Sequence, residues 1–445
     1  MKYTTEHNTW YRSSFEEFEQ GLNGESASGL HKLRRDAIDR VTSLGFPTNR
    51  HEEWRYTNIS PILKANFKPI LSVHSAVVTK ADVERFAFGT RHRLVFVNGF
   101  FSKELSTDGA LPPGAFCGSL ANALRSNHAV AHQHLGRYTK YDDNSFSALN
   151  TAFLRDGAFI FIPDGAVIED SIHLLFIAAG SEPALISPRN LIVIGKNSQL
   201  SIVESYVAVT RETYFTNVVT EIVAGDHSIL EHDKLQDEAR EAFHIASIHA
   251  YQGAQTNFTS NSIALGGSIV RNNVTAVLDA EGSETTLNGL SLATGTQLID
   301  NHTTIDHAKA HCASHELYKS ILDGKSRGVF NGKIFVRKDA QKTDAKQTNK
   351  TLLLSDNATI DTKPQLEIFA DDVKCTHGAT VGQLESEQVF YLRSRGIDEI
   401  TARDILTFAF ASDVVNRVHV EPLRDQLESL VHSRLDQGRE RKEQQ

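Results

Sequence analysis

The chain has 445 residues, of which 40% are hydrophobic and 23% are charged, and its formal net charge is -9. This composition supports a substantial core, in two or three domains or in one elongated domain. An acidic chain lacks the basic surface of a nucleic-acid-binding protein, and apolar runs such as residues 174–179 are too short to span a membrane. We therefore expect neither nucleic acid nor a membrane as a partner.

The cysteine content indicates a reducing compartment. Cys117, Cys312 and Cys375 are odd in number and widely spaced, unlike the cysteines of a disulfide framework. The first residues contain no apolar segment of the kind found in a signal peptide. These features predict a cytoplasmic protein.

Apolar residues follow a helical spacing from residue 13 to residue 45. Ser14, with two glutamates behind it, is typical of a helix start, and Gly45 followed by Phe46 and Pro47 is typical of a helix end. Residues 1–149 are therefore expected to form an N-terminal region that is largely helical at first.

An aromatic segment, residues 50–57, follows this helix and contains Trp54 and Tyr56. Two interpretations are open. The segment is either a recognition patch or a half-buried turn that its aromatic side chains anchor to the core. Because aromatic side chains usually serve packing, we favour the turn.

Between residues 150 and 382 the pattern changes to short apolar or alternating runs separated by small polar turns. The turns recur at intervals of 26 to 32 residues, measured between Gly165, Asn197, His227, Gly253, Gly282 and Ala308. Many short strands without intervening helices are typical of a sandwich, a barrel or a β-solenoid, and the repeat favours the solenoid. A jelly roll or a large antiparallel sandwich is the alternative.

Helical spacing returns in residues 383–445. A first helix is predicted over residues 386–395, with Gly396 as its stop, and Asp398 is a plausible N-cap for a second helix over residues 399–418. A third amphipathic helix is predicted to follow and to fade into a charged tail. A helical region at this end could cap a solenoid or dock a partner.

Residues 323–326, Asp-Gly-Lys-Ser, imitate the end of a phosphate-binding loop. The complete loop requires a glycine five residues before Gly324, and that position is Lys319. We interpret the segment as a turn and expect no nucleotide to bind to this chain.

A row of histidines, His302, His307, His311 and His315, lies nearby in the sequence. The last three are spaced four apart and would share a face within one helix or strand. They form either a metal cluster or a solvated row along one surface, and we favour the row. Cys312, which lies among them, is interpreted as a small buried residue.

Cys375 and His377 lie two residues apart, where the extended pattern is about to become helical. On a strand, both side chains would point to the same face. Thiolate and imidazole are ligands that thiophilic metals and iron–sulfur clusters use. Two ligands cannot complete a four-coordinate site, so the others would come from elsewhere, and a second chain is one source. Taken alone, such a pair is also compatible with a structural role.

The stretch that contains this pair resembles the SufB/SufD family of the SUF iron–sulfur assembly system. The similarity is strongest over about residues 300–420. The segments that carry it are residues 53–57, 328–334, 342–345, 352–354, 363–382 and 387–397.

This resemblance implies a right-handed parallel β-helix (β-solenoid) core flanked by helical terminal regions, and a complex with SufB and the ATPase SufC. Gly378 follows His377 where SufB-type sequences resemble His-Glu-Ala, so the chain is more similar to the SufD side of the family. The resemblance implies a non-catalytic scaffold subunit whose helical region at residues 383–445 docks SufC. It also implies that the end of the β-helix pairs with SufB. There His377, beside Cys375, would share a nascent iron–sulfur cluster with a SufB cysteine.

Three further hypotheses stay open. A β-helix carbohydrate enzyme would use clustered carboxylates, for which Asp300, Asp306 and Glu316 are candidates. Alternatively, the chain only stabilises SufB, and His377 is no more than an interface contact. Whether the isolated chain forms a homodimer is also open.

Overall fold

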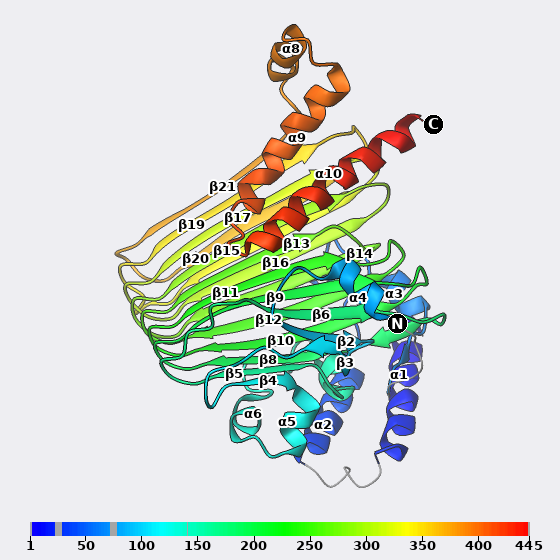
Figure 1. The fold of residues 1–445 in the computed structure, drawn as a ribbon, viewed down its shortest axis with the longest axis vertical. Coiled ribbons are helices and arrows are strands. Elements are labelled where there is room, and N and C mark those ends of the chain that lie inside the picture. The colour runs from blue at the N-terminus through cyan, green and yellow to red at the C-terminus, as the bar shows by residue number, and fades with distance from the viewer. Residues whose placement is uncertain (1, 23–28, 72–77, 140, 444–445) are drawn as a thin grey trace.

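The chain folds into a parallel β-solenoid with helices at both ends (Figure 1). The structure is a computed structural model, and it describes residues 2–22, 29–71, 78–139 and 141–443. Two long sheets face each other across a common core, and each full coil adds one strand to each of them. The predicted β-solenoid with helical ends is therefore confirmed.

Alternate strands along the chain build the two sheets, so each strand pairs with the strand one coil away. In sheet A the strands are β4 (Phe116–Ser119), β5 (Ala158–Ile162), β8 (Arg189–Ile194), β10 (Phe215–Ala224), β12 (Phe243–Gln252), β14 (Ile269–Leu278), β16 (Leu298–His307), β18 (Arg327–Val336) and β20 (Thr359–Ile368). The short strand β7 (Ala184–Ile186) pairs with β10, and β1 (Lys68–Pro69) pairs with β7. In sheet B they are β3 (Phe100–Thr107), β2 (His92–Val97), β6 (Ile172–Ala178), β9 (Gln199–Ala208), β11 (Ile229–Asp237), β13 (Asn257–Ala264), β15 (Glu284–Ala293), β17 (Ala313–Leu322), β19 (Asp344–Leu353) and β21 (Lys374–Gly382).

From β8 onward all the strands of the coils pair in parallel, which excludes the jelly roll and the antiparallel sandwich. Antiparallel pairs occur at the N-terminal end, between β2 and β3 and between β4 and β5. The β4–β5 pair and the parallel pair of β2 with β6 join the N-terminal region to the first coils.

A stack of tight turns produces the repeat seen in the sequence. One residue in each of these turns has a positive φ, and these residues are Gly165, Asn197, His227, Gln255, Gly282, His311 and Lys342. The backbone N–H of each donates to a carbonyl of the next turn, as from Asn197 to Asp226 (2.9 Å) and from Lys342 to Asp372 (2.7 Å). The sequence pattern located most of this stack, but it chose Gly253 and Ala308 where the structure has Gln255 and His311.

The interior of the solenoid is largely apolar and contains buried polar groups in its middle coils. Large apolar side chains, including Phe96, Phe176 and Tyr206, fill the first coils. In the middle coils the buried Lys234 ammonium lies 2.8 Å from His244 Nε2 and donates to Asn272 Oδ1 at 2.7 Å. Because buried charges are tolerated only when they are paired, these contacts account for a polar core here.

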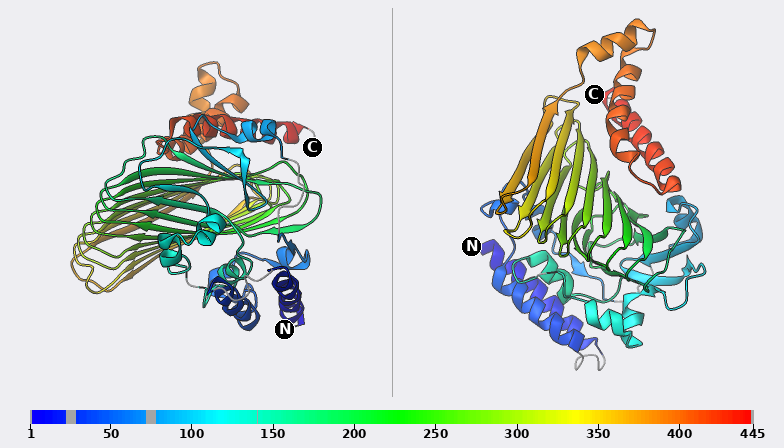
Figure 2. Two further views of the ribbon diagram at one scale, coloured as in Figure 1. Left: turned by 60° about the horizontal axis from the view of Figure 1, so that its bottom comes forward. Right: turned by 90° about the vertical axis from the view of Figure 1, so that its left-hand side faces the viewer.

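The N-terminal region covers one end of the solenoid (Figure 2). Its helical elements are α1 (Lys2–Gln20), α2 (Gly29–Leu44), the 3-10 helix η2 (Glu52–Trp54), α3 (Ser60–Lys64), α4 (Lys80–Phe86), α5 (Leu120–Arg125), α6 (Ala129–His134) and α7 (Ser145–Ala152). The predicted helix end is confirmed, since α2 stops at Leu44 and Gly45 has a φ of 66°. The predicted start at Ser14 is wrong, because α1 runs through it: the residues before Tyr11 are mostly polar and show no apolar period.

Three helices follow the last strand: α8 (Ser386–Ser394), α9 (Glu399–Val415) and α10 (Glu421–Glu443). The predicted cap of α9 is confirmed, because Asp398 Oδ1 accepts from the backbone N–H of Thr401 at 3.0 Å. Gly396 ends the preceding turn with a φ of 89°. Helix α9 packs on β15 and β17, whereas α8 projects from the rest of the molecule (Figure 1). Among the described residues, no helix combines the length and hydrophobicity needed to cross a membrane.

Candidate functional site

The candidate site lies on the last coil, where the solenoid ends. Strand β21 pairs with β19, so that Cys375 is opposite Ala345 and His377 is opposite Gln347. Ala345 and Gln347 are both buried in the interior. Because in-register neighbours of a parallel sheet point to the same face, Cys375 and His377 both face the interior at its open end. The predicted placement of the pair on one face of a strand is confirmed.

The turn before β21 fixes where this strand begins. The backbone N–H of Asp372 donates to Gln341 Oε1 at 2.9 Å, and the carboxylate of Asp372 forms an ion pair with Lys342. The backbone N–H of Lys374 donates to the carbonyl of Thr343 at 2.8 Å. The previous coil thus sets the register of the two ligand candidates.

Cys375 is half-buried beside the apolar cluster of Ile334, Val336 and Ala345. Burial, aided by the nearby Asp344 carboxylate, raises the pKa of the Cys375 thiol. The thiol is therefore mainly protonated at neutral pH, and metal binding would have to displace its proton.

His377 is exposed at the open end. Within the described ranges, no three His, Cys, Asp or Glu side chains lie close enough together to hold a metal ion. The part of the chain that is described therefore offers two soft or borderline ligands on one surface and not a complete site. Val381, further along the same strand, is 45% exposed, and Phe369, which follows β20 and packs on Phe335, is 59% exposed.

A second exposed apolar surface lies on the C-terminal helices. Phe390 and Tyr391 of α8 are 72% and 58% exposed, and Ile400 of α9 is 50% exposed. Polar contacts anchor these helices to sheet B. Lys319 donates to the carbonyl of Phe410 at 2.9 Å and pairs with Asp413. The further anchors in α10 and before it are Arg434 with Asp237 and His419 with Glu231.

The histidine row does not form one surface, so the predicted shared face is wrong. His302 faces outward from sheet A, 3.0 Å from Asp300, whereas the His307 ring lies inside, 2.9 Å from Ser314 Oγ. His311 occupies one of the tight turns with a φ of 60°, and His315 lies on the following strand. The spacing of four residues crosses a strand end, a turn and a new strand, which the sequence pattern did not indicate. Cys312 is buried, as predicted.

The carboxylates proposed for a carbohydrate enzyme are also separated. Asp300 is buried in ion pairs with Arg271 and His302, and Asp306 pairs with Arg337 on the outside of sheet A. Glu316 lies in the interior and accepts from Gln347. These three groups do not share a groove, so the geometry offers no acid–base pair for glycoside hydrolysis.

The aromatic segment at residues 50–57 is a packed turn, as favoured. Trp54 and Tyr56 are half-buried, and the Arg271 guanidinium lies 3.7 Å from the centre of the Trp54 ring. Arg271 also donates to the carbonyl of Glu53 at 2.7 Å. These contacts hold the segment against the outer face of sheet A beside a cavity of about 670 Å³.

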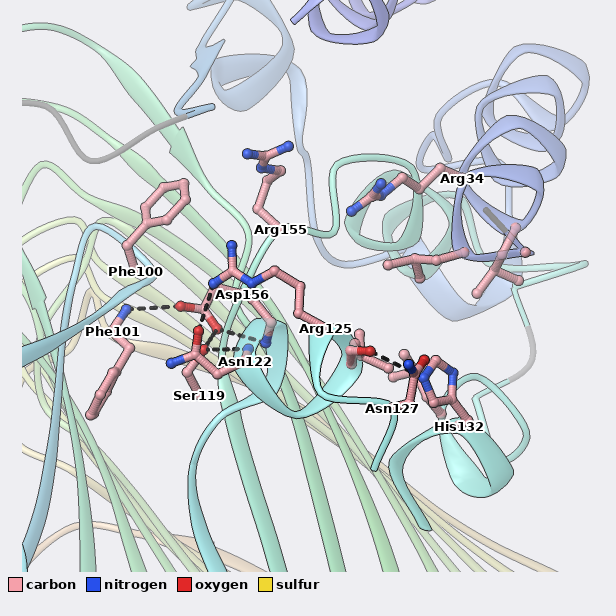
Figure 3. Close-up of a pocket in the computed structure, with 16 residues that line it drawn as sticks. Arg34, Phe100, Phe101, Ser119, Asn122, Arg125, Asn127, His132, Arg155 and Asp156 are labelled. Atoms are coloured by element: carbon pink, nitrogen blue, oxygen red, sulfur yellow. Dashed lines mark hydrogen bonds between the residues drawn. The ribbon is translucent and has the colours of Figure 1, made fainter. Parts of the chain in front are cut away.

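A cavity of about 820 Å³ lies between α2, α5 and β3 (Figure 3). These elements are at the opposite end of the molecule from the last coil (Figure 1). Its carboxylate, Asp156, accepts hydrogen bonds from Ser119 Oγ (2.7 Å), the Phe101 N–H (3.0 Å) and the Ala121 N–H (3.1 Å). Asp156 thus joins β3, β4 and α5, which is a structural role.

The segment that imitates a phosphate loop is a turn, as interpreted. Gly324 has a φ of 71° and connects β17 to β18, and the Lys325 N–H donates to the carbonyl of Gly295 at 2.7 Å. The segment therefore belongs to the turns that lead from sheet B back to sheet A, where it stacks on the turn at Gly295.

Comparisons with known proteins agree with this architecture. Residues 176–410 match the family described as SUF system FeS cluster assembly, SufBD core domain, and residues 5–174 match the SufBD protein N-terminal region. The chain is 36% identical to an iron–sulfur cluster assembly SufBD family protein of Synechocystis, covering 93% of both chains. It is 30% identical to the iron–sulfur cluster assembly protein SufD of Escherichia coli, covering 90% of this chain and 92% of that protein. The corresponding SufD of Bacillus subtilis is 24% identical, with 96% and 97% covered. The chain therefore belongs to the SufBD family of the SUF iron–sulfur cluster assembly system.

Proposed function

We propose that the chain is a SufD-type scaffold subunit that pairs with SufB to build and transfer nascent iron–sulfur clusters, driven by the ATPase SufC. The observation that carries this proposal is the pair Cys375 and His377 at the open end of the solenoid, with no complete ligand set among the described residues. A cluster shared between two chains accounts for both the position and the incompleteness of the pair. A SufB cysteine would supply the missing thiolate.

The chemistry of the two ligands suits transient holding of a cluster. The imidazole of His377 is a neutral ligand that can bind iron reversibly. Cys375, whose thiol pKa is raised by burial, would ligate only after it loses its proton. In this proposal the nascent cluster is cargo, His377 is the metal ligand, and Cys375 is the second cluster-binding residue.

Residues 383–445 are proposed to dock SufC. The exposed apolar side chains of α8 and α9 support this role, because such surfaces commonly mark protein–protein contacts. Movement of these helices on nucleotide binding to SufC would shift the end of the solenoid relative to SufB. The chain itself would act without bound nucleotide, as a non-catalytic cytoplasmic scaffold. Residues 1–149, 150–382 and 383–445 would be its N-terminal, β-helix and docking regions.

The exposed apolar side chains around the open end also favour a second candidate role, in which the chain only stabilises SufB. The same surface would let two copies of this chain pair when SufB is absent. In both cases His377 would be an interface contact rather than a ligand.

Anaerobic co-purification of the chain with SufB and SufC tests the proposal. We expect His377→Ala to abolish the visible absorbance of the cluster while size-exclusion chromatography still shows the complete complex. Thr376→Ala, which alters the neighbouring side chain on the other face of β21, is the matched control. A normal cluster yield from the His377 variant would overturn the proposal and leave the stabilising role.

A further inference from the structure

Three polar residues form a row that ends at the candidate site. The register of sheet B aligns Glu316 of β17 with Gln347 of β19, and Gln347 with His377 of β21. Glu316 and Gln347 are buried in the interior of the solenoid, and His377 occupies the next position at its open end. Because neighbouring strands lie about 4.8 Å apart, successive side chains of such a row are within contact distance.

The amide of Gln347 is held in one orientation. Its Nε2 donates to Glu316 Oε2 at 2.6 Å, and Glu316 in its ionised form has no proton to donate in return to the amide oxygen. Across the interior, a Cβ added at Gly332 would lie 2.4 Å from Gln347 Nε2, so the absence of a side chain there makes room for the amide. The carboxylate thus fixes which end of the amide faces β17.

The other end of the same amide has no partner. Gln347 Oε1 is buried and accepts no hydrogen bond from any residue that the structure describes. A buried acceptor without a hydrogen bond lowers the stability of the folded state by about 1–3 kcal/mol. With Nε2 turned to Glu316, the oxygen lies on the opposite corner of the planar amide, and the neighbour in the row on that side is His377.

We propose that Gln347, oriented by Glu316, is the positioning residue for His377: a rotation of the exposed His377 ring, which does not contact this amide oxygen in the structure, would let its imidazole N–H donate to Gln347 Oε1. This hydrogen bond would hold the ring in a single tautomer and leave its second nitrogen unprotonated toward the open end. Ligating histidines commonly donate their other N–H to such an outer partner, which sets the tautomer and orients the ring. The inference rests on the proposed function in that it supplies the reason for orienting His377.

Nitrogen NMR of the full-length chain labelled with ¹⁵N-histidine tests this arrangement, because the two nitrogens of a single neutral tautomer have well-separated resonances. The His377→Ala spectrum identifies the His377 signals. We expect one tautomer in the wild type and an averaged pair of signals in Gln347→Met, which keeps the length of the side chain but removes the acceptor.

Two further variants separate positioning from simple packing. Glu316→Gln keeps an acceptor for Gln347 Nε2, so this variant is expected to keep the single tautomer of His377. Glu316→Met removes the acceptor and is expected to give averaged His377 signals. Gln252→Met removes a buried amide in a coil remote from β21 and is expected to leave the His377 signals unchanged.

Averaged His377 signals in the wild type would overturn the inference whether or not any variant folds. Unchanged single-tautomer signals in a folded Gln347→Met variant would also overturn it. Neither result contradicts the proposed function. The proposed function is rejected instead if His377→Ala leaves the cluster yield of the complex normal. The two hypotheses can therefore be rejected separately.

Discussion

A single buried carboxyl group, Glu316, is expected to make the stability of this protein depend on pH. Burial raises the pKa of Glu316 to about 7, although the hydrogen bond from Gln347 opposes the shift. The folded state therefore holds this proton more tightly than the unfolded state, so stability falls as pH rises from the unfolded pKa of about 4.5 to about 7. The loss is about 3 kcal/mol at full effect.

Glu316→Gln removes this titration, and we predict that the variant gains stability relative to the wild type as pH rises from 5 to 8. Urea denaturation at four pH values measures the difference. Glu104→Gln, at an exposed position on β3, is the control. If the stability of Glu316→Gln relative to the wild type is the same at every pH, the prediction is wrong.

Among individual residues, the sequence identified the ligand pair but not Gln347, the residue proposed to position His377. Cys375 and His377 carry side chains with metal-binding chemistry, so their spacing in the sequence was informative. Gln347 carries an ordinary amide and lies 30 residues upstream. Its importance depends on the strand register, which is set by stacked turns and not by any local motif. His311 is the opposite case. Its side chain can bind metals, so its spacing in the sequence suggested a shared face, but the residue occupies a tight turn.

Among the elements, the stacked turns need residues that tolerate a positive φ. Gly282 has a φ of 74°, and an added Cβ would lie 3.1 Å from Gln255 Cγ of the neighbouring turn. We predict that Gly282→Ala lowers the free energy of unfolding by about 1–2 kcal/mol, measured by chemical denaturation. Gly89→Ala, where an added Cβ meets no atom within 4 Å, should have a small effect. Equal losses in the two variants would refute the turn argument.

Helix α9 offers a second test at the level of elements. Lys319, whose side chain is only 3% exposed, pairs with the more exposed Asp413 of α9. We predict that Asp413→Ala weakens the docking of α9 by about 1 kcal/mol, since solvent screens part of this interaction. Faster amide hydrogen exchange in α9, without a change in sheet B, would report it. Asp425→Ala on α10 is the control, and equal exchange in both variants would count against the anchor.

Helix caps and strand runs could be predicted because their signals are local, as at Asp398 and at residues 158–162, which form β5. The start of α1 could not be predicted in this way. Its first residues are polar, and Ser14 with its following glutamates imitates a helix start within a helix that already exists.

At the scale of the whole molecule, the open end is expected to control association. Phe369, which follows β20 in the last coil and packs on Phe335, is 59% exposed. We predict that Phe369→Lys reduces binding to SufB at least tenfold by placing a charge in an apolar contact, measured by titration of the purified chains. Val167→Lys, at an equally exposed apolar position in an early coil, should bind normally. If the Phe369 variant binds SufB with unchanged affinity, this surface does not form the SufB contact.

The solenoid was predictable from the spacing of its turns, but its connection to the N-terminal region was not. Strand β2 pairs with β6, and Leu94 lies opposite Leu174 across 80 residues of chain. No local pattern encodes a pairing over that separation. The composition of His92–Val97 fits a buried strand and leaves its partner unspecified.

The docking of the C-terminal helices on sheet B also constrains how this protein can change in length. Their anchors lie on β11, β15 and β17, and the ligand pair lies on β21, two strands beyond β17. Each inserted or deleted coil after β17 would move the pair by about 4.8 Å relative to the helices. A coil gained or lost before β11 would leave this spacing intact. In related chains, variation in coil number is therefore expected among the early coils, while the last ones remain constant in number.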